Sequence, residues 1–146
     1  MSQFSSIERL FARHGLTPVE SVEPLSGGQL NSVVRVNGEW VLRWREARVS
    51  TGSLKREAAL LDRLRGRVKV PELAAAGVDD ILGEYLIQKW IPGQNMLRAW
   101  LENPDVTTRE WWVHQWIAAL HAIHEERFPY PGELIAGRLK EYPNWR

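Results

Sequence analysis

The sequence contains no cysteine among its 146 residues. A chain without cysteine can form neither a disulfide framework nor a thiolate metal site, and nothing in it indicates an oxidising compartment. No stretch approaches the roughly 18 apolar residues of a membrane span, and the first residues lack the basic and apolar segments of a leader. We therefore expect a soluble, cytoplasmic protein that has no membrane partner.

An excess of charge of one sign is also missing. Nineteen Lys and Arg residues stand against eighteen Asp and Glu residues, which leaves a formal net charge of +1. This balance does not provide the concentrated basic surface of a general nucleic-acid binder, so we expect no nucleic acid among the partners.

Several catalytic signatures are absent from the sequence. It has no His-Glu-x-x-His, no Gly-x-Ser-x-Gly and no phosphate loop ending in Gly-Lys-Ser/Thr, which argues against zinc hydrolases, serine hydrolases and P-loop NTPases. His121 and His124 lie three residues apart, but the spacing indicates no third ligand, so we expect no metal site.

The chain does contain enough apolar residues, 44% of the total, to bury one sizeable core. Eight of its residues are tryptophans, which we interpret as core-filling side chains.

The first half of the chain predicts two helices and a hairpin. Ser5 and Glu8 have capping-box spacing, which predicts a short N-terminal helix that ends at Gly15. Residues 33–44 are β-branched and aromatic around Asn-Gly, which predicts two antiparallel strands. A helical period returns at 53–64 and predicts a second helix, closed by Gly66.

The second half predicts further strands and one long helix. Residues 68–70, 73–78 and 85–91 have the composition of strands, with a turn at 79–83. Thr107 and Glu110 have the spacing of a second capping box, which predicts an amphipathic helix to about residue 126. In the tail, residues 133–140 have the composition of a turn or two of helix. The expected fold class is α+β.

Three features carry chemistry. Ser26-Gly27-Gly28-Gln29 precedes the first hairpin strand, and a Gly pair lets backbone N–H groups approach a phosphate, although such a pair is often only a turn. Arg43 is a cation within an apolar strand, where it either faces solvent or has a partner. Glu57 lies on the apolar stripe of the second helix, where a carboxylate requires a cation.

The order of Gly-rich turn, hairpin, strand cation and helix acid is the arrangement with which kinases hold ATP phosphates. At these motifs the chain resembles the aminoglycoside phosphotransferase and choline-kinase-like family, whose small lobe is a twisted antiparallel sheet of about five strands with packed helices. The resemblance extends over nearly the whole chain. Its main segments are Leu-Ser-Gly-Gly-Gln-Leu-Asn (25–31), Trp-Val-Leu-Arg (40–43), Arg-Glu-Ala-Ala-Leu-Leu (56–61), Gln-Lys-Trp-Ile-Pro-Gly (88–93) and Ala-Ala-Leu-His (118–121).

The resemblance implies an ATP site and a role for each matching residue. Arg43 would contact the phosphates and Glu57 would orient Arg43, while the Lys89 carbonyl and the Ile91 N–H would meet the adenine edge. Val33 would lie against the nucleotide. The residues over the phosphates would be Ser26, Gly27, Gly28 and Gln29.

The chain departs from the family pattern after the 118–121 segment. The family continues into a large lobe with a His-Gly-Asp catalytic loop, whereas no histidine here is followed two residues later by Asp. We therefore expect residues 1–92 to form a nucleotide-binding small lobe and 93–146 to begin an absent large lobe. The chain would resemble an ATP-dependent kinase of small-molecule hydroxyls but be inactive alone, with magnesium bound only when the missing lobe is present.

Two other interpretations stay open. The chain could be a non-catalytic module that binds a large catalytic lobe or a second copy of itself, or it could be a truncated remnant. The phosphate acceptor and the choice between ATP and GTP are not predicted.

The hairpin poses a geometric question. A two-residue Asn-Gly turn would put Val33 and Arg43 on opposite faces of the sheet, whereas the resemblance points both toward the nucleotide. We therefore predict an odd-length loop or a bulge at this hairpin.

Overall fold

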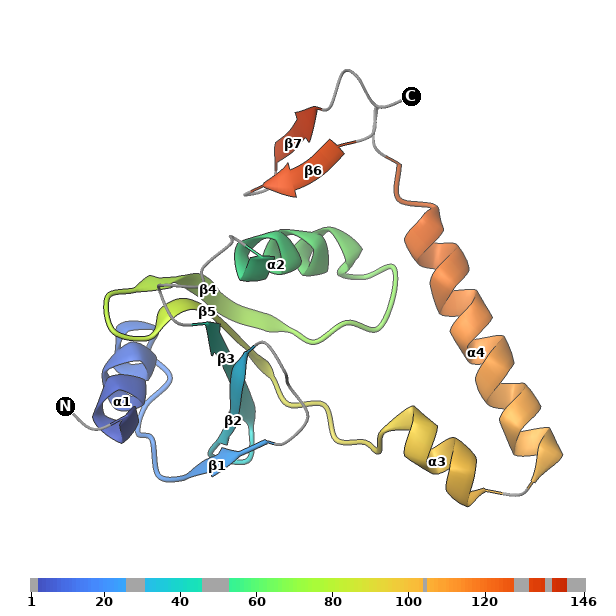
Figure 1. The fold of residues 1–146 in the computed structure, drawn as a ribbon, viewed down its shortest axis with the longest axis horizontal. Helices are drawn as coiled ribbons and strands as arrows, with labels where there is room; N and C mark the ends of the chain where they lie inside the picture. Colours follow the sequence, from blue (N-terminus) through green and yellow to red (C-terminus); the bar gives the residue numbers. More distant parts are fainter. Residues whose placement is uncertain are drawn as a thin grey trace.

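The computed structural model describes residues 3–25, 31–45, 53–103, 105–127, 132–135 and 138–141. Their secondary structure mixes helices and antiparallel strands, which confirms the predicted α+β class (Figure 1). In chain order the elements are α1 (Gln3–Arg13), β1 (Val22–Pro24), β2 (Ser32–Val36), β3 (Trp40–Arg45), α2 (Ser53–Leu64), β4 (Leu73–Asp79), β5 (Gly83–Lys89), α3 (Met96–Glu102), α4 (Val106–His124), β6 (Gly132–Ile135) and β7 (Arg138–Glu141).

Five of these strands form one antiparallel sheet in the order β1-β2-β3-β5-β4. The sheet lies between α1 and α2, as Figure 1 shows. Strands β6 and β7 pair separately as a two-stranded hairpin, and β6 contacts α2.

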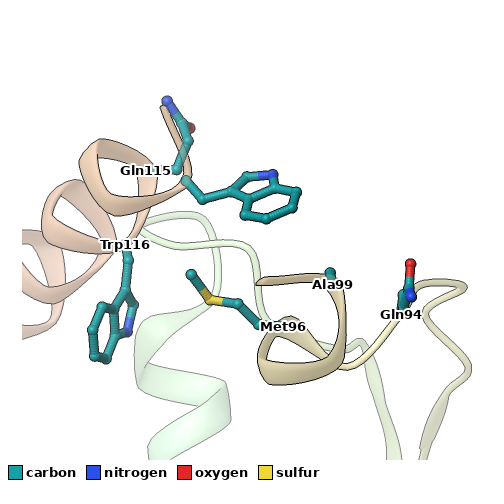
Figure 2. Close-up of a pocket in the computed structure, with 6 residues that line it drawn as sticks. Gln94, Met96, Ala99, Gln115 and Trp116 are labelled. Atoms are coloured by element: carbon teal, nitrogen blue, oxygen red, sulfur yellow. The ribbon is translucent and has the colours of Figure 1, made fainter. Parts of the chain in front are cut away.

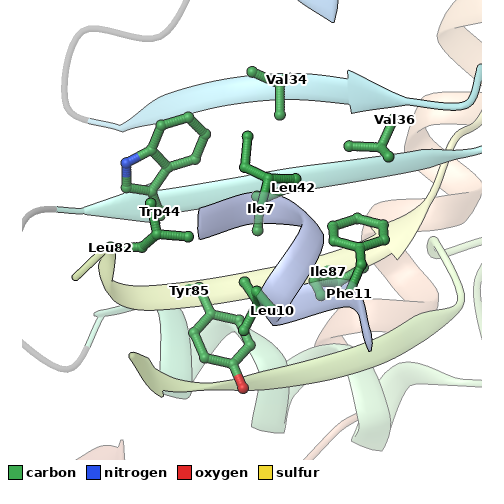
Figure 3. Close-up of a cluster of buried hydrophobic side chains, with 10 residues drawn as sticks. All are labelled: Ile7, Leu10, Phe11, Val34, Val36, Leu42, Trp44, Leu82, Tyr85 and Ile87. Atoms are coloured by element: carbon green, nitrogen blue, oxygen red, sulfur yellow. The ribbon is translucent and has the colours of Figure 1, made fainter. Parts of the chain in front are cut away.

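The main hydrophobic core lies between α1 and one face of the sheet (Figure 3). Side chains alternate between the two faces of a strand, so one set of alternate residues from β2, β3 and β5 reaches this core. Helix α1 contributes Ile7, Leu10 and Phe11, all nearly or fully buried. The sheet side of the cluster consists of Val34, Val36, Leu42, Trp44, Tyr85 and Ile87.

Helix α1 is also fixed to the sheet by a buried carboxylate at the end of β4. Arg9 Nη2 donates to Asp79 Oδ1 over 2.9 Å, and Arg13 Nη2 donates to Asp79 Oδ2 over 3.1 Å. The backbone N–H groups of Ile81 and Leu82 donate to Oδ1 over 3.0 and 3.1 Å. Burial alone would raise the pKa of Asp79, but these two backbone donors and the two guanidinium groups hold the pKa below its ordinary value.

The opposite face of the sheet packs against α2. Leu54 and Ala58 contact Leu86 of β5 in a second buried cluster. The buried Glu84, also on β5, accepts a 2.9 Å hydrogen bond from the Lys55 N–H in the first turn of α2. A carboxylate at the N-terminal end of a helix satisfies free N–H groups and complements the helix dipole.

Several predicted boundaries are confirmed and others are wrong. Helix α2 spans the predicted residues, and Gly15 and Gly66 adopt positive φ angles of 69° and 80° after their helices. Helix α1, however, begins at Gln3, so Ser5 lies inside it and does not cap it. Asp105, not Thr107, caps α4, because its side chain accepts from the Thr108 N–H over 2.8 Å.

Three further expectations differ from the structure. Residues 68–70 do not form a strand, since Val68 makes only an isolated bridge to Arg65. Helix α3 was not predicted, and it begins after Asn95, whose side chain accepts from the Arg98 N–H. The tail contains the hairpin of β6 and β7 where helix was expected.

Helices α3 and α4 extend away from the sheet, and neither contains a buried residue (Figure 1). The core-filling interpretation of the tryptophans therefore holds for Trp44, which is 5% exposed, but not for Trp111 and Trp116, each 58% exposed. Among the described residues, no helix is long and apolar enough to cross a membrane.

Candidate functional site

The β2–β3 hairpin sets the geometry of the candidate site. Val36 pairs with Trp40, which leaves a three-residue loop, and Val33 consequently pairs with Arg43. Asn37 and Gly38 in the loop have φ angles of 53° and 65°, a region that Gly and Asn occupy more readily than other residues. The predicted odd-length loop is confirmed, and Val33 and Arg43 share one face of the sheet.

The loop is anchored by the side chain of Asn37. Its Oδ1 accepts from the Glu20 and Ser21 N–H groups over 2.8 and 3.1 Å, and its Nδ2 donates to the Pro18 carbonyl over 2.7 Å. These bonds hold the turn against the segment that follows α1. The position of β2 relative to β3 is thus fixed from outside the hairpin as well.

Arg43 and Glu57 form the ion pair that the sequence predicts. Arg43 Nη1 donates to Glu57 Oε1, and both side chains are partly exposed. Arg43 lies opposite Leu86 on β5, directly below the packing site of α2. The helix therefore brings the carboxylate to the strand cation, and Arg43 does not simply point into solvent.

The segment after β5 is tied to the sheet on both sides. The Lys89 N–H donates to the Glu72 carbonyl over 2.8 Å, and the Trp90 N–H donates to the Glu39 carbonyl over 2.7 Å. The side chain of Lys89 pairs with Glu39 and lies over the Trp40 ring at 4.4 Å. The Ile91 N–H has no hydrogen-bond partner among the described residues.

A cavity of about 470 Å³ lies on the α2 side of the sheet, between the hairpin and this segment. Its lining is mostly apolar with a few polar groups, which is typical of small-molecule sites. The lining residues are Leu25, Val33, Val41, Arg43, Pro71, Gln88, Lys89, Trp90, Ile91 and Asn95.

The structure thus brings most of the described candidate residues together. Val33, Arg43, Lys89 and Ile91 line the same cavity, and Glu57 reaches it through its ion pair with Arg43. The remaining predicted phosphate-binding residues, Ser26, Gly27, Gly28 and Gln29, lie outside the described residues.

Sequence reasoning missed Val41, Gln88 and the other residues that complete the cavity. The period-2 alternation puts Val41 on the face of Arg43, which is a usable signal. Gln88 pairs with Val41 across β3 and β5, but that pairing joins strands far apart in the sequence. No local pattern gives its register.

A second hollow of about 480 Å³ lies between α3 and α4 (Figure 2). Its lining residues are Gln94, Met96, Ala99, Trp112, Gln115 and Trp116. In Figure 2 the Met96 side chain points toward α4. This hollow contains none of the predicted site residues.

Comparison with known proteins identifies similar solved structures, among them several aminoglycoside phosphotransferases. A single-residue variant of aminoglycoside 2′-phosphotransferase-IIIa in complex with GDP matches 89% of this chain with a TM-score of 0.68 and 20% identity. The wild-type GDP complex matches 64% of the chain with a TM-score of 0.53 and 26% identity. A streptomycin–ATP ternary complex of APH(2″)-IIa matches 88% with a TM-score of 0.67 and 15% identity.

These matches cover 46%, 32% and 44% of the respective solved chains, so this chain spans less than half of their length. Among curated proteins, none matches the sequence. A model of the phosphotransferase enzyme family matches residues 21–146, which is most of the chain. The chain therefore belongs to the phosphotransferase enzyme family.

Proposed function

We propose that this chain is the ATP-binding N-terminal portion of a phosphotransferase that acts on the hydroxyl of a small molecule. The observation that carries the proposal is that Val33, Arg43, Lys89 and Ile91 line one cavity, with Glu57 paired to Arg43. Nucleotide complexes among the similar structures, with GDP and with ATP, support it.

The two ends of the cavity would bind different parts of the nucleotide. At the end nearest the segment after β5, the Ile91 N–H and the Lys89 carbonyl would receive the adenine edge, with Leu25 and Val33 as apolar walls. At the other end, Arg43 would bind phosphate oxygens, because its fork of N–H donors suits phosphate geometry. Glu57 would hold the guanidinium in place so that it need not be ordered on binding.

Magnesium does not fit the residues at hand. Among the described residues, no group of three His, Asp or Glu side chains lies close enough to hold a metal ion. No His-x-Asp pair occurs in the sequence to supply a catalytic base. We therefore assign nucleotide binding to this chain and phosphoryl transfer to a catalytic lobe that supplies those groups.

Thermal melting with and without ATP tests the proposal. A ligand present at ten times its Kd stabilises the folded state by about 1.4 kcal/mol, which would raise the melting temperature by about 4 °C in a domain of this size. We expect that rise for the wild-type chain and its loss in Arg43→Ala. Arg65→Ala is the matched control, because Arg65 is an exposed arginine that pairs with Asp62 at the end of α2.

The control should respond to ATP as the wild type does. A melting temperature that ATP leaves unchanged in the wild type would argue against nucleotide binding. Equal responses of the wild type and Arg43→Ala would instead remove Arg43 from the site while leaving the rest of the proposal intact.

A second candidate function is a module that associates through α3 and α4. These helices expose large apolar side chains, with Leu97 at 67%, Leu101 at 72%, and Trp111 and Trp116 at 58%. Exposed apolar side chains that gather into a large patch mark interaction sites in soluble proteins. A catalytic lobe is the partner that we propose, and a second copy of the chain would use the same surface.

Light scattering tests whether a second copy of the chain binds to α3 and α4. If the chain covers this surface with its own copy, the molar mass should approach twice that of one chain as concentration rises, and Trp116→Glu should return it to the monomer value. Ile81→Glu serves as the control, because Ile81 is exposed to a similar degree, 48%, in the turn between β4 and β5. A mass that stays monomeric at all concentrations would exclude self-association.

A further inference from the structure

Gln88, the residue before Lys89 on β5, has a buried side-chain oxygen that has no role in the proposed nucleotide site so far. Its Oε1 atom is buried and has no hydrogen-bond partner in the part of the chain that the structure describes. The residue lines the cavity, and its neighbours across the sheet are Val41 and Leu73, which offer no side-chain donor. An amide oxygen without a donor therefore lies in the wall of the cavity, between two apolar neighbours on the adjacent strands.

Such a group requires an explanation. Leaving a buried carbonyl oxygen without a donor costs about 1 to 3 kcal/mol, and native proteins contain few of them. The terminal torsion of a glutamine is broad, so rotation about its last bond can exchange the oxygen and the NH2 group. Rotation of the amide can therefore turn the buried oxygen toward the cavity, where Gln88 would offer a ligand one acceptor and an adjacent donor.

The same wall of the cavity carries the backbone groups that would receive a base. Lys89 follows Gln88 directly and Ile91 lies two residues further on, so a planar ring that meets the Lys89 carbonyl and the Ile91 N–H has a neighbouring edge beside Gln88. In adenine that edge consists of the N6 amino donor and the N7 acceptor, the pair that a glutamine amide matches with two hydrogen bonds.

We propose that Gln88 reads the adenine base, with Oε1 accepting from the N6 amino group and Nε2 donating to N7. This inference rests on the proposed nucleotide site and assigns its base specificity. Guanine presents two acceptors, O6 and N7, along the same edge. Whichever way the Gln88 amide turns, its oxygen then faces one of these two acceptors, and O6 also faces the Lys89 carbonyl, so the site favours ATP over GTP.

Nucleotide analogues test the two hydrogen bonds separately from the fold. The dissociation constants of ATP, 7-deaza-ATP and GTP are measured by tryptophan fluorescence on the 146-residue chain, in the wild type and in Gln88→Met. Because 7-deaza-ATP lacks only the N7 acceptor, we expect it to bind the wild type about fivefold more weakly than ATP, the value of one neutral hydrogen bond. We expect GTP to bind more than tenfold more weakly than ATP.

Gln88→Met retains the approximate volume of the side chain but has no amide. We expect ATP and 7-deaza-ATP to bind this variant equally, and its preference for ATP over GTP to fall at least fivefold. Gln115→Met is the matched control, because Gln115 lies on α4 beside the other hollow, and it should retain both wild-type ratios.

The outcomes separate the two proposals. Equal binding of ATP and 7-deaza-ATP to the wild type would overturn the role of Gln88 while leaving the nucleotide site in place, and it requires no variant to fold. A wild-type ratio that persists in Gln88→Met would overturn it as well. Failure of ATP to bind the wild type at all would overturn the proposed function, and the base reading with it.

Discussion

Replacing Asp79 by asparagine is expected to lower the free energy of unfolding by about 2 to 3 kcal/mol at neutral pH. The Asp79 side chain is fully buried and accepts from Arg9, Arg13 and two backbone N–H groups. An amide can still accept in the turn, but it loses the charge-assisted bonds to both guanidinium groups and places its own NH2 against one of them. Urea unfolding of the two proteins measures the difference.

The stability difference between wild type and Asp79→Asn should depend on pH and decrease at acid pH. The pKa of Asp79 is held below its ordinary value of 3.8 in the folded state. A carboxyl group of this kind stabilises the fold at pH values above its unfolded pKa, and the contribution disappears as the pH falls through the folded value. The difference in unfolding free energy between wild type and Asp79→Asn should therefore be constant from pH 7 to about 5 and narrow progressively below about pH 4.

Asp80→Asn provides the control, because Asp80 is the exposed neighbour in the same turn. It should unfold at nearly the wild-type urea concentration at every pH. A gap that stays constant down to pH 2 would mean that the ionised carboxylate is not the source of the stabilisation.

Phe11→Ala should cost still more, about 3 to 5 kcal/mol of unfolding free energy. Phe11 is fully buried where α1 meets the sheet, among Val36, Leu42 and Ile87, as Figure 3 shows. Removing the ring loses the free energy gained by transferring it from water into the core. It also leaves a cavity, because the close-packed sheet can move only partly to fill the space. In the most severe case, Phe11→Ala would be unfolded at 37 °C and would show no cooperative unfolding transition.

Phe4 supplies a control of the same residue type on the same helix. Its side chain is 41% exposed, so Phe4→Ala should cost less than about 1 kcal/mol. Similar losses in the two variants would contradict this account, because the burial of Phe11 would then not be the source of the larger cost.

Local signals predicted much of the fold. The Asn37-Gly38 turn and the helical period of residues 53–64 depend on residues close together in the sequence, and the structure confirms both. The odd length of the hairpin loop is also confirmed, but it was predicted from the family resemblance, which points Val33 and Arg43 to one face of the sheet. The pairing of Arg43 with Glu57 was also predictable, because a carboxylate on an apolar stripe requires a cation and the chain offers one on the preceding strand.

Other parts depend on contacts that a local pattern does not contain. Asp79 resembles an ordinary turn residue, and only the packing of α1 onto the sheet makes it a buried anchor. Gln88 enters the cavity through the register of β5 with β3 and β4. The capping-box pattern misplaced two helix starts, because α1 already begins at Gln3 and α4 begins after the cap residue Asp105.

The three-residue connection from Asn37 to Glu39 restricts how the chain can vary in length. Deleting one residue there would force either β2 or β3 to turn its apolar side chains to the wrong face, which exchanges the surroundings of Leu42 and Arg43. Inserting two residues preserves the alternation and requires only a longer loop. We infer that natural or engineered versions of this chain tolerate length changes in this hairpin in steps of two, so loop length can be used to screen related sequences for an intact site.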